Sequence, residues 1–136
     1  MPESLDPALL APIEKVARFM ETGDESLLSA FASEGVVIVE NFAPHLFQGP
    51  DAVQRWSRRI LSWHESGDLV LKHTFGQPQD LSVSDDLAFV SLPTHWSFAQ
   101  GEDQFEEDGG WAFVLVRKDG QWKVRSYGWA VTAIYD

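Results

Sequence analysis

Four histidines are the first side chains to consider for chemistry, because imidazole titrates near neutral pH. His73 shares strand parity with Leu69, Leu71 and Phe75, so it is expected to face the interior as a general acid or base. A core histidine satisfied by its neighbours is the competing interpretation. His95 is the second candidate acid or base, although the local pattern LPTHWSF does not fix which face it occupies.

The other histidines extend the search to metals. His45 precedes a predicted helix and is placed at a pocket mouth, whereas His64 ends that helix and is expected to be exposed. Three histidines can bind zinc, but none here has close ligand spacing such as His-x-His. The acidic run 102–108 lacks the ligand order of a calcium loop and indicates a solvated hairpin tip. We therefore predict no metal site and no cofactor.

The composition limits the class of protein. A chain of 136 residues predicts a single domain over residues 1–136. A formal net charge of -11 disfavours binding to nucleic acid, and the absence of cysteine excludes disulfides and thiolate chemistry. No stretch approaches the ~20 apolar residues that cross a bilayer, and the acidic start differs from a secretory signal. These features predict a cytoplasmic protein without membrane contact.

The elements that position these residues are helices first and strands afterwards. Apolar spacing predicts a helix from about Pro12 to Glu21, a short helix capped by Asp24 and a third opened by Gly49-Pro50. Strands are predicted over 36–40, 69–75, 86–99, 104–118 and 121–134, with a bulge at Gly109-Gly110 and a two-residue turn at Asp119-Gly120. This order predicts an α+β fold, with three N-terminal helices packed on a strongly curved, mostly antiparallel sheet around a hollow.

Three segments carry a family resemblance: METGDESLLSAFASEGVVIVEN, QGPDAVQRW, and DLAFVS followed by AFVLVRKDGQWKV. In this order they resemble the nuclear transport factor two-like superfamily, which includes SnoaL-like and ketosteroid-isomerase-like proteins. The resemblance implies a cone-shaped α+β barrel with a pocket between the third helix and the concave sheet face. It also implies a homodimer through the sheet. It implies no single activity, because this fold hosts many.

The resemblance also bears on catalysis. Steroid-isomerising members carry an Asp base in a segment that corresponds to Val39-Glu40-Asn41-Phe42, so Asn41 occupies the base position. The oxyanion-donor position corresponds to Val16, with Phe19 nearby, and neither has a hydroxyl. An amide does not accept a proton as a carboxylate does. Glu40 would replace the base only if the strand register slipped by one residue.

Strand alternation predicts which aromatic residues face the hollow. Val124 and Ser126 are expected to face inward, and Tyr127 and Trp129 outward, where a dimer interface would cover them. Trp56 is expected to form a pocket wall, with plain packing as the alternative. The full predicted pocket lining is Val16, Phe19, Met20, Asn41, His45, Trp56, Ile60, Phe75, Trp111 and Ser126.

Two functions follow from these expectations. The first is a SnoaL-like pocket that binds a small apolar cyclic molecule. It would act without a cofactor as an isomerase-, cyclase- or hydratase-like enzyme, with His73 or His95 as acid or base and Asn41 as a hydrogen-bond donor. The second is a non-catalytic dimerisation or protein-interaction module. A hollow plugged by Trp56, Phe75 and Trp111 would favour the second function, and an open, polar-dotted hollow the first.

Overall fold

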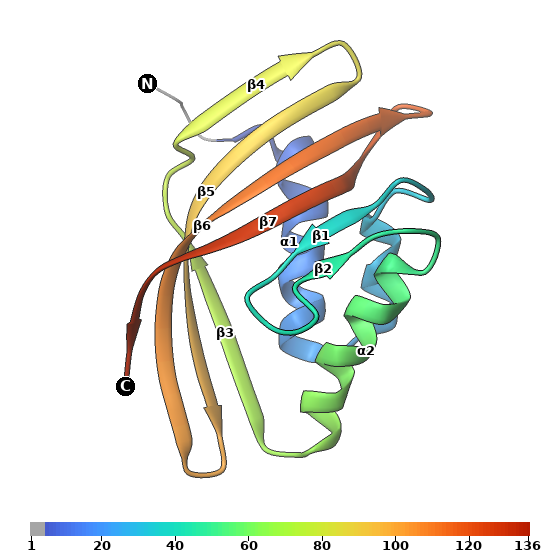
Figure 1. Ribbon diagram of the computed structural model, residues 1–136. Coiled ribbons are helices and arrows are strands. Elements are labelled where there is room, and N and C mark those ends of the chain that lie inside the picture. The colour runs from blue at the N-terminus through green and yellow to red at the C-terminus, as the bar shows by residue number, and fades with distance from the viewer. Residues whose placement is uncertain (1–4) are drawn as a thin grey trace.

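The computed structural model describes residues 5–136 and places the helices against one face of a curved sheet (Figure 1). The helices are α1 (Pro7–Thr22), the 3-10 helix η1 (Glu25–Ala30) and α2 (Ala52–Glu65). The strands are β1 (Val37–Val39), β2 (Leu46–Phe47), β3 (Leu69–Phe75), β4 (Asp80–Ser84), β5 (Leu87–Gln100), β6 (Asp103–Lys118) and β7 (Gln121–Tyr135). The predicted α+β class with a curved, mostly antiparallel sheet is confirmed, and one of the three predicted helices is a 3-10 helix. Among residues 5–136, none of the helices combines the length and the apolar character that a membrane span requires.

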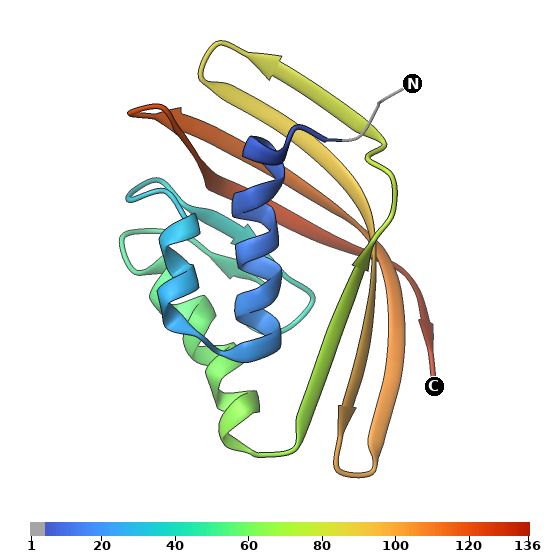
Figure 2. The ribbon, with the colours of Figure 1, turned by 180° about the vertical axis from the view of Figure 1, so that it is seen from behind.

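The sheet has seven strands in the order β2-β1-β7-β6-β5-β3, and β4 pairs with β5 beyond the end of β3. All pairings are antiparallel except that of β1 with β7. Seen from behind, the long strands bend around α1 and α2 without closing into a barrel (Figure 2). The concave face of the sheet therefore meets the helices and holds the core.

Both ends of α1 are fixed by local sequence. The Asp6 carboxylate accepts a hydrogen bond from the Ala8 amide at 2.9 Å, and Pro7 occupies the first helical position. Gly23 ends the helix with a left-handed φ of 73°, and its amide donates to the Phe19 carbonyl at 2.7 Å. The predicted start near Pro12 is wrong, because the cap at Asp6 starts the helix earlier and Pro12 is buried inside it.

The strands match the predicted segments closely, and the hairpin at Asp119-Gly120 is confirmed. Both turn residues have positive φ, 54° and 76°, as a tight two-residue turn between twisted strands requires. Two strands lie outside the predicted segments. β2 has only two residues, of which Phe47 is buried, so it is too short to show an alternation in the sequence. β4 (DLSVS) is exposed at every position and has no core-facing pattern.

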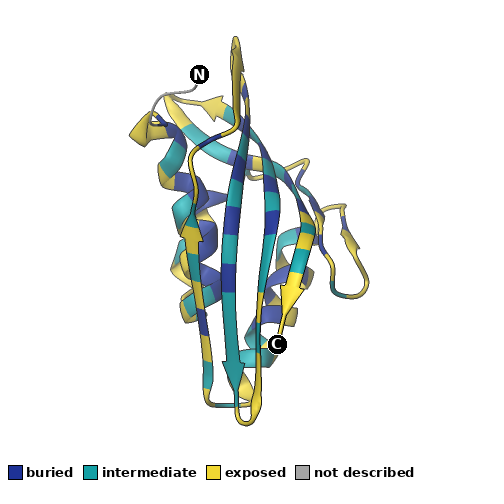
Figure 3. Ribbon diagram, turned by 90° about the vertical axis from the view of Figure 1, so that its left-hand side faces the viewer, coloured by how far each residue is buried: buried dark blue, intermediate teal, exposed yellow. Residues whose placement is uncertain are grey.

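An extra residue in β7 reverses the predicted side-chain directions at its centre. Leu115 pairs with Val124 and Val114 with Ser126, which leaves Arg125 without a partner residue in β6. Val124 faces the core before this bulge, and Tyr127 faces the core after it. The prediction that Ser126 faces inward while Tyr127 and Trp129 face outward is therefore wrong. Figure 3 shows buried positions alternating with mostly intermediate ones along the long strands.

A second register shift lies beside the predicted glycine bulge. Asp108 pairs with Ala133 and Gly109 with Val131, so the extra residue is Thr132 in β7. Gly109 is needed there for a steric reason. A Cβ on Gly109 would lie 2.5 Å from the Ala130 carbonyl oxygen and 2.6 Å from the Trp129 ring.

We expect Gly109→Ala to push Trp129 out of place and to lower the free energy of unfolding by about 1–3 kcal/mol, the usual cost of overpacking. Urea denaturation measures this change. Gly110→Ala is the matched control, because a Cβ on Gly110 meets nothing within 4 Å. Equal unfolding midpoints for the two variants would contradict the close contact between Trp129 and Gly109.

Candidate functional site

A cavity of about 290 Å³ lies on the concave side of the sheet, next to the segment that follows β1. Its wall is mostly aromatic and contains two carboxylates, and no Lys, Arg or His of the described residues takes part in it. The lining residues are Met20, Glu40, Asn41, Phe42, Trp63, Leu71, Trp96, Phe98, Phe105, Glu107, Trp111 and Trp129. An apolar cavity with a few polar groups is typical of small-molecule sites.

Glu40 reaches this cavity because the strand alternation of β1 continues beyond its end. Val36, Ile38 and Glu40 are buried, whereas Val39 is exposed, so every second side chain turns to the core. Glu40 is 6% exposed. Its Oε2 accepts a hydrogen bond from Trp56 Nε1 at 3.1 Å and a second, short one from the Tyr127 hydroxyl. Two core aromatic residues thus fix the carboxylate at the cavity wall.

Burial dominates the electrostatics of Glu40. Removal from water raises the pKa of its carboxyl from the ordinary 4.5 to about 7, against the lowering effect of the Tyr127 and Trp56 hydrogen bonds. The negative charge of Glu107 raises this pKa further. Burial also raises the pKa of Tyr127 well above its ordinary value, so the phenol stays protonated and donates. Near neutral pH, Glu40 can therefore either take up or release a proton.

Glu107 is the second carboxylate of the cavity. It is half-buried on β6, and Trp129 Nε1 donates a hydrogen bond to its Oε1 at 3.1 Å. Burial raises its pKa, and the hydrogen bond from Trp129 acts in the opposite direction. The bulge in β7 that turns Trp129 inward therefore also supplies this hydrogen-bond donor.

The predicted pocket residues fall into three groups. Met20, Asn41 and Trp111 line the cavity. Another group packs beneath or beside the cavity, and Trp56 acts there as the hydrogen-bond donor to Glu40: Val16, Phe19, Trp56, Ile60 and Phe75. His45 and Ser126 do not line the cavity. His45 lies on an exposed loop. Ser126 lies on the outer sheet face, because the extra residue Arg125 shifts the alternation of β7.

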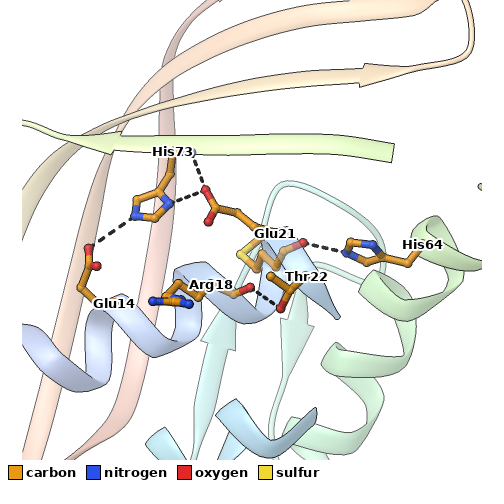
Figure 4. Close-up of polar contacts among 7 residues, drawn as sticks. Glu14, Arg18, Glu21, Thr22, His64 and His73 are labelled. Carbon is orange, nitrogen blue, oxygen red and sulfur yellow. Dashed lines mark hydrogen bonds and ion pairs between the residues drawn. The ribbon is translucent and has the colours of Figure 1, made fainter. Parts of the chain in front are cut away.

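His73 lies next to the cavity but is not one of its lining residues. Its Nδ1 and its backbone amide both contact Glu21 Oε2, at 2.7 and 2.8 Å, and its Nε2 lies 3.5 Å from Glu14 Oε1 (Figure 4). Both carboxylates come from α1. The imidazole is mostly buried, with 11% of its side chain exposed, and joins α1 to β3. This carboxylate–imidazole pair is compatible with either a structural or an acid–base role.

The remaining histidines are bound to other groups. His95 contacts Asp108 and Glu106, each at 2.7 Å, on the face opposite Trp96, and these hydrogen bonds raise its pKa. His64, expected to be exposed, is half-buried and bonds the Met20 carbonyl at 2.8 Å (Figure 4). His45 Nδ1 lies 3.2 Å from the Glu40 carbonyl oxygen. Within residues 5–136, no three His, Asp or Glu side chains are arranged to hold a metal ion.

Glu107 and Tyr127 were not predicted as site residues, and Glu40 was expected to act as a base only with a slipped register. The alternation of Val36, Ile38 and Glu40 already indicated an inward carboxylate, but the resemblance placed the catalytic position at Asn41. No register slip is needed, since Ile38 pairs with Tyr127 and Glu40 follows the same inward parity. Tyr127 was missed because no sequence feature marks the extra residue at Arg125.

Residues 10–133 match the family model of the SnoaL-like domain. This family is part of the nuclear transport factor two-like superfamily, whose fold the chain has. The chain therefore belongs to the SnoaL-like family. No curated protein matches its sequence.

Solved structures share this fold at low sequence identity. A type 2 hexachlorocyclohexane dehydrochlorinase, LinA, is 14% identical with a TM-score of 0.75, over 93% of this chain and 84% of the other. A putative scytalone dehydratase from Novosphingobium aromaticivorans is 18% identical with a TM-score of 0.76, over 95% and 85%. The Kfla4162 protein from Kribbella flavida is 10% identical with a TM-score of 0.78, over 95% and 91%. At these identities the likeness shows the fold alone.

The raised pKa of Glu40 predicts a pH-dependent stability. A carboxyl whose pKa is higher in the folded state stabilises the protein below its unfolded pKa, and this contribution is lost as pH rises through the folded value. For Glu40 the loss spans pH 4.5 to about 7 and amounts to about 3 kcal/mol. We expect Glu40→Gln to remove this decline.

Urea unfolding of both proteins from about pH 4 to about pH 8 measures the difference between their free energies of unfolding. The stability of the wild type should fall relative to Glu40→Gln as the pH rises. A constant difference across this range would show that Glu40 keeps an ordinary pKa in the folded protein.

Proposed function

We propose that this chain is a cofactor-independent enzyme that moves a proton on a small apolar molecule bound in the cavity. The buried carboxylate of Glu40 supports this proposal most directly. It lies on an apolar wall, has no cationic partner among the lining residues and has a pKa of about 7. A general base works best when its pKa lies near the working pH.

In the proposed reaction, ionised Glu40 takes a proton from a carbon next to a carbonyl group. The electron pair of the broken C–H bond moves to the carbonyl oxygen, which gives an enolate and a protonated carboxyl. Return of the proton to the same carbon regenerates Glu40 and completes an exchange. In a ketone with a β,γ double bond, return of the proton to the γ-carbon shifts that double bond and completes an isomerisation. Glu107, with its own raised pKa, supplies a second proton-carrying group on the same wall.

The exchange of carbon-bound hydrogen tests this function. We expect the wild type to speed deuterium uptake by beta-tetralone in D₂O, followed by NMR, and Glu40→Gln to slow it by roughly 10²–10⁴-fold. The amide keeps the shape and the acceptor oxygen but cannot take the proton. Exchange no faster with wild type than in buffer would count against proton transfer on ketones of this kind.

His73→Gln is the companion variant in the same assay. The contact of His73 with Glu21 makes it an alternative base, as the sequence suggested. If Glu40 is the base, His73→Gln should keep most of the exchange activity. Loss in His73→Gln with retention in Glu40→Gln would move the base from Glu40 to the histidine pair.

We also propose that a second copy of the chain covers the outer face of the sheet. Tyr127 and Trp129 are buried in the core, so the interface must use other residues than those predicted. The outer face instead presents a shallow apolar depression, lined among others by Val37, Val39, Leu87, Phe89, Ala112, Val114 and Gly128. Val39 is 46% exposed and Phe89 is 37% exposed, and both belong to this one apolar patch, which an interface would cover.

Light scattering after size-exclusion chromatography tests this interface. We expect a dimer for the wild type and a monomer for Phe89→Asp, because a buried unpaired charge opposes association. Val83→Asp is the control. Val83 is exposed as well, but it pairs with Ala88 and so lies on the opposite face from Phe89. A monomeric wild type would contradict the proposal.

A further inference from the structure

Trp111 has a buried hydrogen-bond donor without a partner. The residue is 2% exposed and lines the cavity from the middle of β6. Among the described residues, its Nε1 is the one buried side-chain nitrogen or oxygen for which no acceptor exists. A buried N–H without an acceptor destabilises a protein, so such a group calls for a function.

The surroundings explain why the protein itself does not satisfy this donor. The rings of Phe75, Trp96, Phe113, Tyr127 and Trp129 all lie with centroids within 6.3 Å of the Trp111 ring. The polar groups nearby make other hydrogen bonds: the Tyr127 hydroxyl donates to Glu40, and Glu107 accepts from Trp129. None of the described residues accepts a hydrogen bond from Trp111 Nε1, and Trp111 lines the cavity, so a molecule bound there is a natural source of the acceptor.

The charge and size of the cavity limit that molecule. Glu40 and Glu107 repel an anion, and the wall has no cationic side chain to pair with one. About 290 Å³ lies at the lower end of the range for ligand pockets, which suits one or two rings. Seven aromatic side chains, namely Phe42, Trp63, Trp96, Phe98, Phe105, Trp111 and Trp129, provide flat apolar surface for such rings.

We propose that the cavity binds a neutral molecule of one or two rings whose single acceptor oxygen takes a hydrogen bond from Trp111 Nε1. This inference rests on the proposed function in one respect, that the cavity is the ligand site. It assigns Trp111 a binding role: the N–H selects molecules with an acceptor over hydrocarbons of equal shape. It also orients the bound molecule relative to Glu40.

Matched ligands test this selection. Beta-tetralone carries one carbonyl oxygen, and tetralin has the same two-ring frame without it. The ratio of their affinities, taken from NMR titrations, is compared between the wild type and Trp111→Phe. We expect the preference for the ketone to fall about tenfold in the variant, which corresponds to about 1.4 kcal/mol for one hydrogen bond. Trp122→Phe makes the same change at an indole that does not line the cavity, and it should leave the ratio unchanged.

The indole resonance of Trp111 supplies a readout that does not depend on the variant folding. In the wild type, its ring lies 5.3 Å from the Tyr127 ring, which allows assignment through space. Its N–H proton should move downfield with beta-tetralone, as it does on forming a hydrogen bond, and not with tetralin. An unmoved resonance, or an equal affinity ratio in wild type and Trp111→Phe, would overturn the role of Trp111.

Two further outcomes separate the inference from the proposed function. If protonated beta-aminotetralin binds more tightly than the ketone, the cavity selects a cation and the neutral-ligand proposal is wrong. If beta-tetralone binds with the Trp111 shift but exchanges no hydrogen, the binding role holds and the proton-transfer function fails. If Glu40→Gln loses the exchange activity and Trp111→Phe changes neither exchange nor the affinity ratio, the proton-transfer function holds and the binding role of Trp111 fails.

Discussion

The burial of one carboxylate, Glu40, sets the constraints that the rest of the site must meet. An isolated charge is costly in an apolar interior, so the group needs either hydrogen-bond donors or a proton. The structure supplies the donors, since Trp56 and Tyr127 both bond Oε2. They do not fully offset burial, because the pKa still rises to about 7. Near neutral pH the carboxyl is therefore protonated in part of the molecules and ionised in the rest, whereas a fully paired carboxylate would stay ionised.

One irregularity of β7 and a glycine of β6 assemble the polar part of this site. A regular β7 would keep the parity of Val124 and turn Tyr127 and Trp129 to the outer face. The extra residue at Arg125 instead brings the hydroxyl of Tyr127 to Glu40 and the indole of Trp129 to Glu107. Gly109 then leaves room for the Trp129 ring. Bulges often re-aim side chains next to functional sites, and here one bulge aims two of them.

The fold was more predictable from the sequence than the site. Periodicity and turn residues locate a helix, a strand or the Asp119-Gly120 hairpin, because these depend on neighbours in the chain. Met20, Asn41 and Trp111 line the cavity, and their role in binding a ligand stays a prediction. The position of Tyr127 depends on how β6 and β7 pair, and an extra residue in a strand leaves no mark on local composition. Glu40 is the opposite case. Its alternation with Ile38 is a local pattern that indicates a buried side chain, but the family resemblance assigned the base position to the next residue, Asn41.

The polar contacts outside the cavity have a consequence for its shape. Glu21 accepts two hydrogen bonds from His73 and so fixes the end of α1 against β3, where Met20 and Leu71 line the cavity. His64 bonds the carbonyl of Met20 and fixes α2 beside α1, next to Trp63 on the cavity wall. Apolar contacts alone are not directional and would allow this hollow to collapse. Directional bonds at its rim keep the helices at a set distance from the sheet, and an aromatic cavity can then stay open around Glu40.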